Sequence, residues 1–168
     1  MDILEIERTL PQAGPVREVE KAWCDYNGHL NMAWYGVLFE RALDDMLEDV
    51  GLGADWRART GGSFFALATM HHYLREVLAG EHVRIVYRVL DFDAKKVHAF
   101  FTMLHEEKGF RAATMEILFL HVNMTTRRSA EMDADTLAVF RRLRESTQNL
   151  PWPPEAGAKI GIRRKRDR

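Results

Sequence analysis

One short stretch of the sequence holds the residue types that acyl-transfer chemistry needs. Asp25, Asn27 and His29 stand two residues apart within Asp25-Tyr26-Asn27-Gly28-His29-Leu30-Asn31. In a loop with a tight turn, side chains two residues apart can converge on one point. A carboxylate there could activate a water molecule or attack a carbonyl carbon, and an imidazole could orient the reactants or shuttle a proton. The stretch therefore predicts hydrolysis of an activated acyl group.

A long helix is predicted directly after this stretch. Apolar residues recur with helical spacing from Met32 to Val50, and Asn31 is a candidate cap for the first turn. The start of a helix offers unpaired backbone N–H groups and the positive end of its dipole, which would polarise a carbonyl oxygen placed there. The spacing alone also fits a plain alternative, in which Asn27 and Gly28 only form a turn and Asp25 and Asn31 only cap.

Beyond this helix the apolar pattern changes from a helical period to alternation. The polar residues 55–62 predict a loop at the change. A short strand over Val16–Trp23 and a second, more polar helix over Ala134–Glu145 flank the alternating region. Four strands with short joints predict an antiparallel meander: Ser63–Val77, His82–Leu90, Lys96–His105 and Arg111–Val122. The order predicts an α+β fold, a twisted antiparallel sheet wrapped around one central helix, with a dimer covering what one sheet leaves exposed.

Composition limits the classes of function. The chain has 168 residues, 24 Lys and Arg against 25 Asp and Glu, and a single cysteine, Cys24. This balance gives no whole-chain attraction for nucleic acid or an anionic membrane, and one cysteine excludes an intramolecular disulfide framework or a Cys-rich zinc site. No apolar window approaches the roughly 18 residues of a membrane span, and residues 1–15 lack the pattern of a secretory signal. We therefore expect a soluble, cytoplasmic protein with one domain over residues 1–150.

Residues 151–168 are predicted to form a Pro-containing basic tail. Chain ends are commonly solvated, so we expect this tail to be partly ordered. A local patch for a phosphate-bearing ligand or a nucleic acid is the alternative, and the near-neutral charge of the whole chain weighs against it. Six of the last ten residues are basic: Lys159, Arg163, Arg164, Lys165, Arg166 and Arg168.

The stretch from Asp25 to Asn31, followed by Tyr35 and Glu40-Arg41-Ala42, resembles the hot-dog acyl-CoA thioesterases of the 4-hydroxybenzoyl-CoA thioesterase type. Those enzymes have an Asp-containing loop, often D-x-x-G-H-x-N, that runs into a central helix. The D-x-N-x-H part is also similar to the catalytic loop of plant acyl-ACP thioesterases. A second match is Tyr73-Leu74-Arg75-Glu76-Val77 with Gly80-Glu81, like the family's Y-L-x-E-V-x-x-G-D segment. The resemblance spans about Val16 to Val122 and implies the hot-dog fold.

The resemblance implies a set of roles. Asp25 would be the base or nucleophile. Asn27 and His29 would position the Asp25 carboxylate, the water molecule or the thioester. Backbone N–H groups near Asn31 would polarise the thioester carbonyl. The substrate would be an acyl-CoA, without a metal or redox cofactor. The family works as homodimers or dimers of dimers with each site at a subunit interface. Substrate-binding roles would fall to Gly28, Asn31, Tyr35 and Glu76.

A narrower likeness is to the betainyl-CoA thioesterases of carnitine breakdown. It covers the W-x-D-Y-N-G-H-x-N form from Trp23 onward, but Ala68 and Met70 stand where that group has an acid and a histidine. Aromatic side chains such as Trp23, Trp34 and Tyr35 could face a quaternary ammonium group, although large aromatics at the start of a helix usually pack in a core.

Two other functions stay open. A hot-dog enoyl-CoA hydratase or dehydratase would resemble G-D-x-N-P-x-H, but here the spacing from Asp to His is one residue shorter and the Pro is missing. A non-catalytic acyl-CoA-binding module is the third reading. Among the remaining histidines, His71 and His72 are adjacent, so they lie on opposite faces of their predicted strand and cannot form a facing pair.

Overall fold

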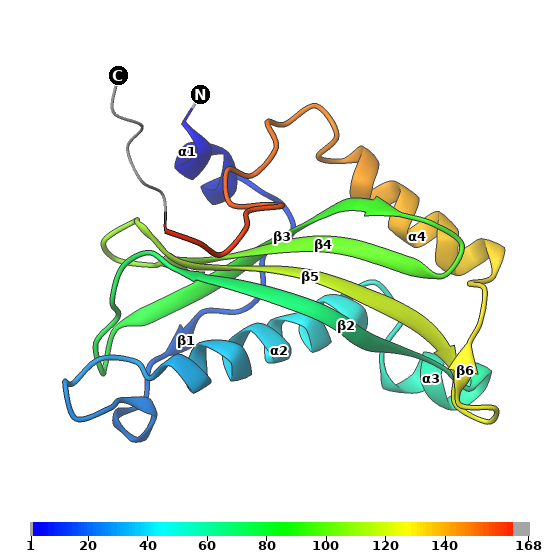
Figure 1. Cartoon of the computed structure of the whole chain (residues 1–168), viewed down its shortest axis with the longest axis horizontal. Coiled ribbons are helices and arrows are strands. Elements are labelled where there is room, and N and C mark those ends of the chain that lie inside the picture. Colours follow the sequence, from blue (N-terminus) through cyan, green and yellow to red (C-terminus); the bar gives the residue numbers. More distant parts are fainter. Residues whose placement is uncertain (1, 163–168) are drawn as a thin grey trace.

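One long helix, α2 (Met32–Asp49), lies against the inner face of a curled antiparallel sheet in the computed structural model of this chain (Figure 1). The structure describes residues 2–162. The strand order is β1–β3–β4–β5–β2, and β6 pairs with β5. This arrangement confirms the expected α+β, hot-dog architecture. The strands are β1 (Arg17–Glu18), β2 (Gly62–Tyr73), β3 (His82–Phe92), β4 (Lys96–His105), β5 (Arg111–Asn123) and β6 (Arg128–Ser129).

The core lies between α2 and the inward side chains of the sheet. Alternate residues of β3, β4 and β5 point inward, as the period of two requires. Leu38, Phe39 and Met46 of α2 are completely buried against them. Each large apolar side chain buried in this way contributes about 1.5–3 kcal/mol. The apolar stripe of α2 is therefore what holds the helix, and with it the Asp25 loop, in place.

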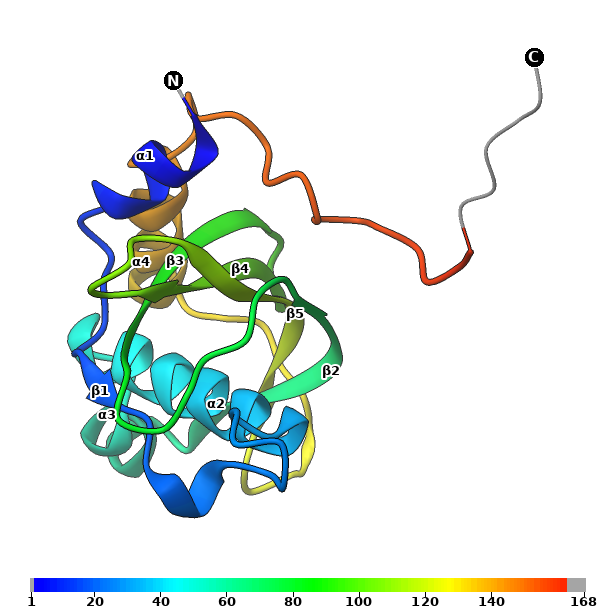
Figure 2. The same cartoon turned by 90° about the vertical axis from the view of Figure 1, so that its left-hand side faces the viewer.

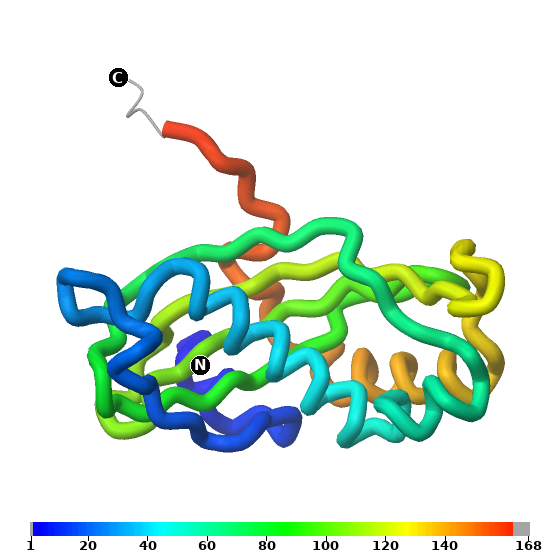
Figure 3. Tube along the Cα trace, turned by 90° about the horizontal axis from the view of Figure 1, so that it is seen from below, coloured from blue at the N-terminus to red at the C-terminus, as the bar shows by residue number. Residues whose placement is uncertain are grey.

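The predicted meander is wrong at its first joint. β2 pairs antiparallel with β5, not with β3, so residues 74–81 form a crossover and not a hairpin turn. The crossover leaves the sheet beside Ala112, whose carbonyl oxygen accepts from the N–H groups of Leu74 and Arg75. It rejoins the sheet beside Val19, whose N–H donates to Glu81. Pairing β2 with β5 lets the sheet curl around α2, and Figure 3 shows β2 running beside the helix.

Three smaller predictions also need correction. The predicted loop over residues 55–62 contains the helix α3 (Ala54–Thr60), because Trp56 buries its ring against Phe64 and Gly61 ends the helix with φ 69°. The predicted strand over Val16–Trp23 keeps only β1, and a 3₁₀ turn, η1 (Lys21–Trp23), ends the segment. A short helix, α1 (Ile3–Arg8), was not expected. The second helix, α4 (Ala134–Glu145), has the predicted bounds.

One buried ionic cluster attaches α1 and the C-terminal segment around Glu155 to the outer face of the sheet. Arg111 of β5 lies 2.7 Å from the Glu7 carboxylate of α1 and 2.8 Å from Glu155 of the C-terminal segment. Thr102 donates a 2.7 Å hydrogen bond to Glu7. The described part of the predicted tail, residues 151–162, thus follows the sheet as far as Gly157 and then projects from the body (Figure 2). The basic residues from Arg163 onward lie outside the described residues.

Candidate active site

The Asp25 loop is a five-residue turn closed by its own main chain. The N–H of Asp25 donates to the carbonyl oxygen of His29 at 3.0 Å, and the N–H of Gly28 donates back to Asp25 at 3.0 Å. Gly28 has a φ of 83°, in the left-handed region that favours glycine. The N–H of Asn27 donates to Oδ1 of Asp25 at 2.8 Å. These bonds fix the Asp25 carboxylate relative to the backbone.

The turn leads directly into the first turn of α2. The predicted cap is confirmed, because Oδ1 of Asn31 accepts from the N–H of Ala33 at 2.9 Å. The carbonyl oxygen of Asn31 accepts from Trp34 and Tyr35. Within the described part of the chain, the N–H of Met32 has no hydrogen-bond acceptor. This donor, at the positive end of the helix dipole, is available to an oxygen atom outside the chain.

An open cleft of about 320 Å³ lies between this loop, α2 and the crossover. It brings together four residues predicted from the sequence: Asp25, His29, Tyr35 and Glu76. The other lining residues are Leu30, Met32, Tyr73, Leu74 and Arg75. Three of these, Tyr73, Leu74 and Arg75, belong to the second matched segment. The pairing of β2 with β5, and the crossover that follows β2, place them at the cleft with Asp25. The cleft is mostly apolar, with a few charged groups at defined positions.

Asp25 and His29 face each other across the turn. Oδ2 of Asp25 lies 3.7 Å from Nδ1 of His29, and the side chains are 19% and 33% exposed. Because Oδ1 is already held by the N–H of Asn27, Oδ2 is the oxygen that can accept a proton. A carboxylate with one fixed oxygen and one open oxygen, beside an imidazole, has the parts of a general base.

Two tyrosines form the wall opposite the loop. The rings of Tyr35 from α2 and Tyr73 from β2 meet edge to face with centroids 5.2 Å apart. Burial raises the pKa of Tyr35 to about 12, so its phenol stays protonated at neutral pH and can donate a hydrogen bond. Such a wall offers aromatic faces together with a polar tip.

Three residues predicted for the site do not line the cleft. Asn27 and Gly28 are exposed at the tip of the turn, and the side chain of Asn31 is engaged in the cap. The backbone N–H of Asn27, and not its side chain, is the group that bonds the Asp25 carboxylate. Roles for Asn27, Gly28 and Asn31 in the reaction stay predictions, and within this chain their visible effect is to shape the loop.

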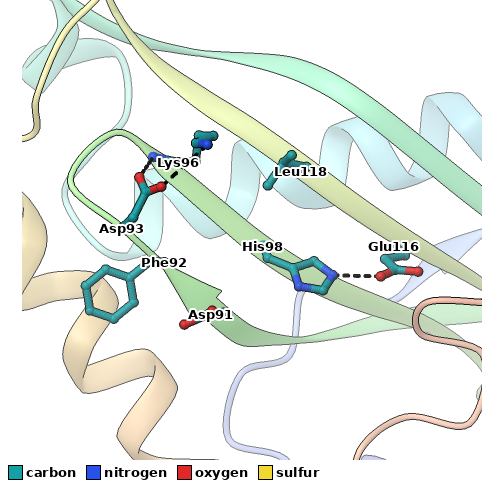
Figure 4. Close-up of a pocket in the computed structure, with 7 residues that line it drawn as sticks. All are labelled: Asp91, Phe92, Asp93, Lys96, His98, Glu116 and Leu118. Atoms are coloured by element: carbon teal, nitrogen blue, oxygen red, sulfur yellow. Dashed lines mark hydrogen bonds and ion pairs between the residues drawn. The ribbon is translucent and has the colours of Figure 1, made fainter.

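A larger concavity of about 410 Å³ lies on the opposite face of the sheet (Figure 4). His98 and Glu116 pair there at 2.7 Å, and Asp93 accepts from the N–H groups of Lys95 and Lys96. Its charged groups are therefore engaged by neighbours within the chain, and it contains no helix start. For these reasons we place the candidate active site at the Asp25 cleft.

Among residues 2–162, no cluster of three or more His, Cys, Asp or Glu side chains is placed to bind a metal ion. None of the helices in that range has the length and hydropathy to cross a membrane.

Comparison with known proteins matches the chain to the thioesterase-like superfamily over residues 19–140, which include both the Asp25 loop and the crossover. A betainyl-CoA thioesterase from Pseudomonas aeruginosa is 34% identical over 140 residues, 83% of this chain and 88% of that protein. A Ruegeria pomeroyi L-carnitine dehydrogenase/betainyl-CoA thioesterase is 33% identical over 159 residues, 95% of this chain but 32% of that protein. The chain thus spans about a third of this relative.

Solved structures agree with the sequence comparison. A hypothetical protein from Staphylococcus aureus, solved in complex with CoA, matches 90% of this chain and 95% of its own, with a TM-score of 0.84 and 25% identity.

Proposed function

Because the chain belongs to the thioesterase-like superfamily, we propose that it is an acyl-CoA thioesterase whose reaction takes place in the cleft beside Asp25. The enzyme converts an acyl-CoA and water to a free acid and CoA. One observation carries the placement: the Asp25 carboxylate, the His29 imidazole and the first turn of α2 meet at the same cleft. A thioester is an activated carbonyl, so a polarising donor and one base are physically sufficient.

In the proposed reaction, Asp25 is the general base. Its Oδ2 takes a proton from a water molecule, whose oxygen attacks the thioester carbon. The N–H of Met32 stabilises the negative charge on the carbonyl oxygen in the tetrahedral intermediate. The C–S bond then breaks, and the proton held by Asp25 passes to the thiolate, with His29 as the neighbouring group that can relay it. The Asp25 carboxylate suits this role because the N–H of Asn27 holds its Oδ1, which leaves Oδ2 to take the proton.

Direct attack by Asp25 on the thioester is the alternative to water attack. Isotope labelling separates them in a single turnover with enzyme in excess and water enriched in ¹⁸O. Water attack puts the label into the free acid in the first turnover. Nucleophilic attack expels CoA and forms a mixed anhydride of the acyl group with Asp25. When water then attacks the Asp25 carbonyl carbon of this anhydride, the acid leaves unlabelled with an oxygen from Asp25, and the label enters Asp25.

The size and lining of the cleft favour a small to medium acyl group. The relative from Pseudomonas aeruginosa is a betainyl-CoA thioesterase, so a betainyl-like acyl group is one substrate to test. Tyr35 and Tyr73 offer aromatic faces to a quaternary ammonium group. Trp23 and Trp34 suit that role less well, because they stack on each other at 5.0 Å and Arg41 covers Trp23.

Self-association belongs to the same proposal. β2 is an edge strand, and residues 65–69 of it are exposed, including Phe65 and Leu67. A second copy paired along this edge would cover these apolar groups and lie next to Tyr73, at the cleft. We propose a homodimer, or a dimer of dimers built from it, in the cytoplasm. We also propose that residues 1–150 are the catalytic domain and residues 151–168 an appended tail.

A thiol-release assay with a panel of acyl-CoAs tests the function. Free CoA released with turnover supports the thioesterase. Hydration of an enoyl-CoA without thiol release would indicate a hydratase, and saturable binding of acyl-CoA without either reaction would indicate a binding module. Each of these two outcomes would overturn the proposal.

A further inference from the structure

Two carboxylates line the Asp25 cleft, and one of them has no task in the proposed reaction. Asp25 is the base of that reaction, whereas Glu76 reaches the cleft from the crossover. Among the described residues that line the cleft, Arg75 supplies the permanent positive charge. The lining therefore carries more negative than positive charge whenever the His29 imidazole is neutral.

The charge of Glu76 is open to a partner from outside the chain. Asp25 faces His29, with Oδ2 3.7 Å from Nδ1. Among the residues that the structure describes, no basic side chain forms an ion pair with Glu76. Arg75, its neighbour in the sequence, instead holds its guanidinium over the ring of Phe110, 3.9 Å from the ring centroid. The Glu76 side chain is also exposed, so a ligand in the cleft can approach it.

The surface beside Glu76 is apolar and partly aromatic. Met32 and Leu74 line the cleft together with Tyr35 and Tyr73. Tyr73 is 47% exposed, so part of its ring is open to a ligand. Burial is the main cause of the raised pKa of Tyr35, and the negative charge of Glu76 adds to it. The carboxylate therefore lies near the tyrosine wall of the cleft.

A quaternary ammonium group matches this combination of surfaces. It carries a full positive charge but has no N–H group to donate, so it is held by carboxylates and by the faces of aromatic rings. Its methyl groups gain free energy from contact with apolar side chains. An acyl group that ends in a carboxylate would instead be repelled by the two acids of the cleft.

We propose that Glu76 is a specificity residue of the cleft, which selects acyl-CoAs whose acyl group carries a quaternary ammonium next to the thioester. The Glu76 carboxylate faces the cation, and Tyr73 packs against its methyl groups. Glu76 acts on the substrate and takes no part in bond cleavage. This inference rests on the proposed function of the Asp25 cleft.

The test compares two substrates that have the same shape and differ in charge. Betainyl-CoA and 3,3-dimethylbutyryl-CoA differ only in the atom that bears the methyl groups, a positively charged nitrogen in the first and a carbon in the second. The measured quantity is the ratio of kcat/KM for betainyl-CoA to kcat/KM for its neutral counterpart. A nearby cation also makes a thioester more reactive, but this effect cancels when the ratio of a variant is compared with that of the wild type.

Glu76→Gln should lower this ratio about threefold or more, because it removes the charge and keeps the shape. The change should come chiefly from slower hydrolysis of betainyl-CoA, with the melting temperature near wild type. Glu76→Asp keeps the charge and should retain part of the ratio. Added salt should lower the ratio of the wild type more than that of Glu76→Gln, because salt screens the attraction.

Glu20→Gln is the matched control. Glu20 is an exposed acid that precedes the Asp25 loop but does not line the cleft, so its loss should leave the ratio unchanged. Three results would overturn the inference and leave the thioesterase proposal intact: a wild type that hydrolyses other acyl-CoAs but not betainyl-CoA, a wild-type ratio that does not fall with added salt, or a ratio that Glu76→Gln changes no more than Glu20→Gln does. Absence of thiol release from every acyl-CoA would instead overturn the proposed function.

Discussion

The main-chain N–H of Leu30 donates to the carbonyl oxygen of Val77 at 2.8 Å, which ties the Asp25 loop to the crossover. The two segments that resemble a thioesterase in sequence are thereby held as the two sides of one cleft. Val77 is completely buried, so its carbonyl is a fixed acceptor. The position of Asp25 therefore depends on the pairing of β2 with β5, which sends the chain across the sheet at this point.

Loss of the Asn31 cap should destabilise the protein and loosen the start of α2. We expect Asn31→Ala to lower the free energy of unfolding by about 1 kcal/mol, the usual contribution of a side-chain cap. Chemical denaturation measures this. Asn27→Ala is the control for stability, because the Asn27 side chain is exposed, and it should change stability by less than about 0.5 kcal/mol. Equal losses in the two variants would argue against the cap.

Glu81 should make the crossover sensitive to acid. Burial raises the pKa of the Glu81 carboxyl. Hydrogen bonds from the Leu78 N–H, Lys108 and His105 outweigh this effect and lower the pKa to about 2. A depressed carboxyl pKa stabilises the folded state above the unfolded pKa, near 4.5, and this stability disappears as pH falls toward the folded value.

We therefore expect Glu81→Gln to cost about 1–3 kcal/mol at pH 7. The difference in unfolding free energy from wild type should shrink as the pH falls from 5 to 2. Denaturation at several pH values measures it, and a difference that stays constant over this range would contradict the assignment.

The cluster of Glu7 and Arg111 should be costly to break from one side. The Glu7 and Arg111 side chains are only 1% and 11% exposed. Arg111→Met leaves a buried carboxylate without its cation, and we expect a loss of about 3–5 kcal/mol. The double variant with Glu7→Gln should recover part of this loss. Single variants within about 0.5 kcal/mol of wild type would show that the cluster does not hold α1 and the C-terminal segment.

The edge of β2 should control self-association. Leu67 is 51% exposed on that edge, and a charge there opposes pairing of two edges. We expect Leu67→Lys to be monomeric by light scattering at concentrations where the wild type is dimeric, with lower turnover if the second copy completes the cleft. Ile160→Lys, at an exposed apolar residue of the C-terminal segment, is the control and should remain dimeric. A wild type that is monomeric at high micromolar concentration would refute the proposed interface.

The sequence predicts best the features that local chemistry decides. The cap at Asn31 and the bounds of α4 follow from helix rules, and the alternation of apolar residues predicts β3 to β5. Several strands have a similar apolar pattern, and contacts between residues far apart in the sequence decide which of them pairs with β2. The local turn signals at residues 78–81 therefore indicated β3, which is not its neighbour. α3 was missed because a single buried side chain, Trp56, stabilises an otherwise polar segment.

The candidate site follows the same division. Asp25 and His29 meet because they belong to one short turn, which spacing can predict. Asn27 has the same spacing but lies outside the cleft, at the exposed tip of the turn. The contribution of Tyr73 and Arg75 to the cleft depends on the crossover, and that path is fixed by strand pairing rather than by local sequence.

The most direct test of the account is the turnover of Asp25→Asn with the best acyl-CoA substrate, measured by thiol release. Asparagine keeps the shape and an oxygen that can accept the Asn27 N–H, but it cannot take a proton from water. We predict that kcat falls at least about 100-fold while the melting temperature and the affinity for the acyl-CoA stay near wild type. Wild-type turnover in the folded variant would contradict the central role of Asp25.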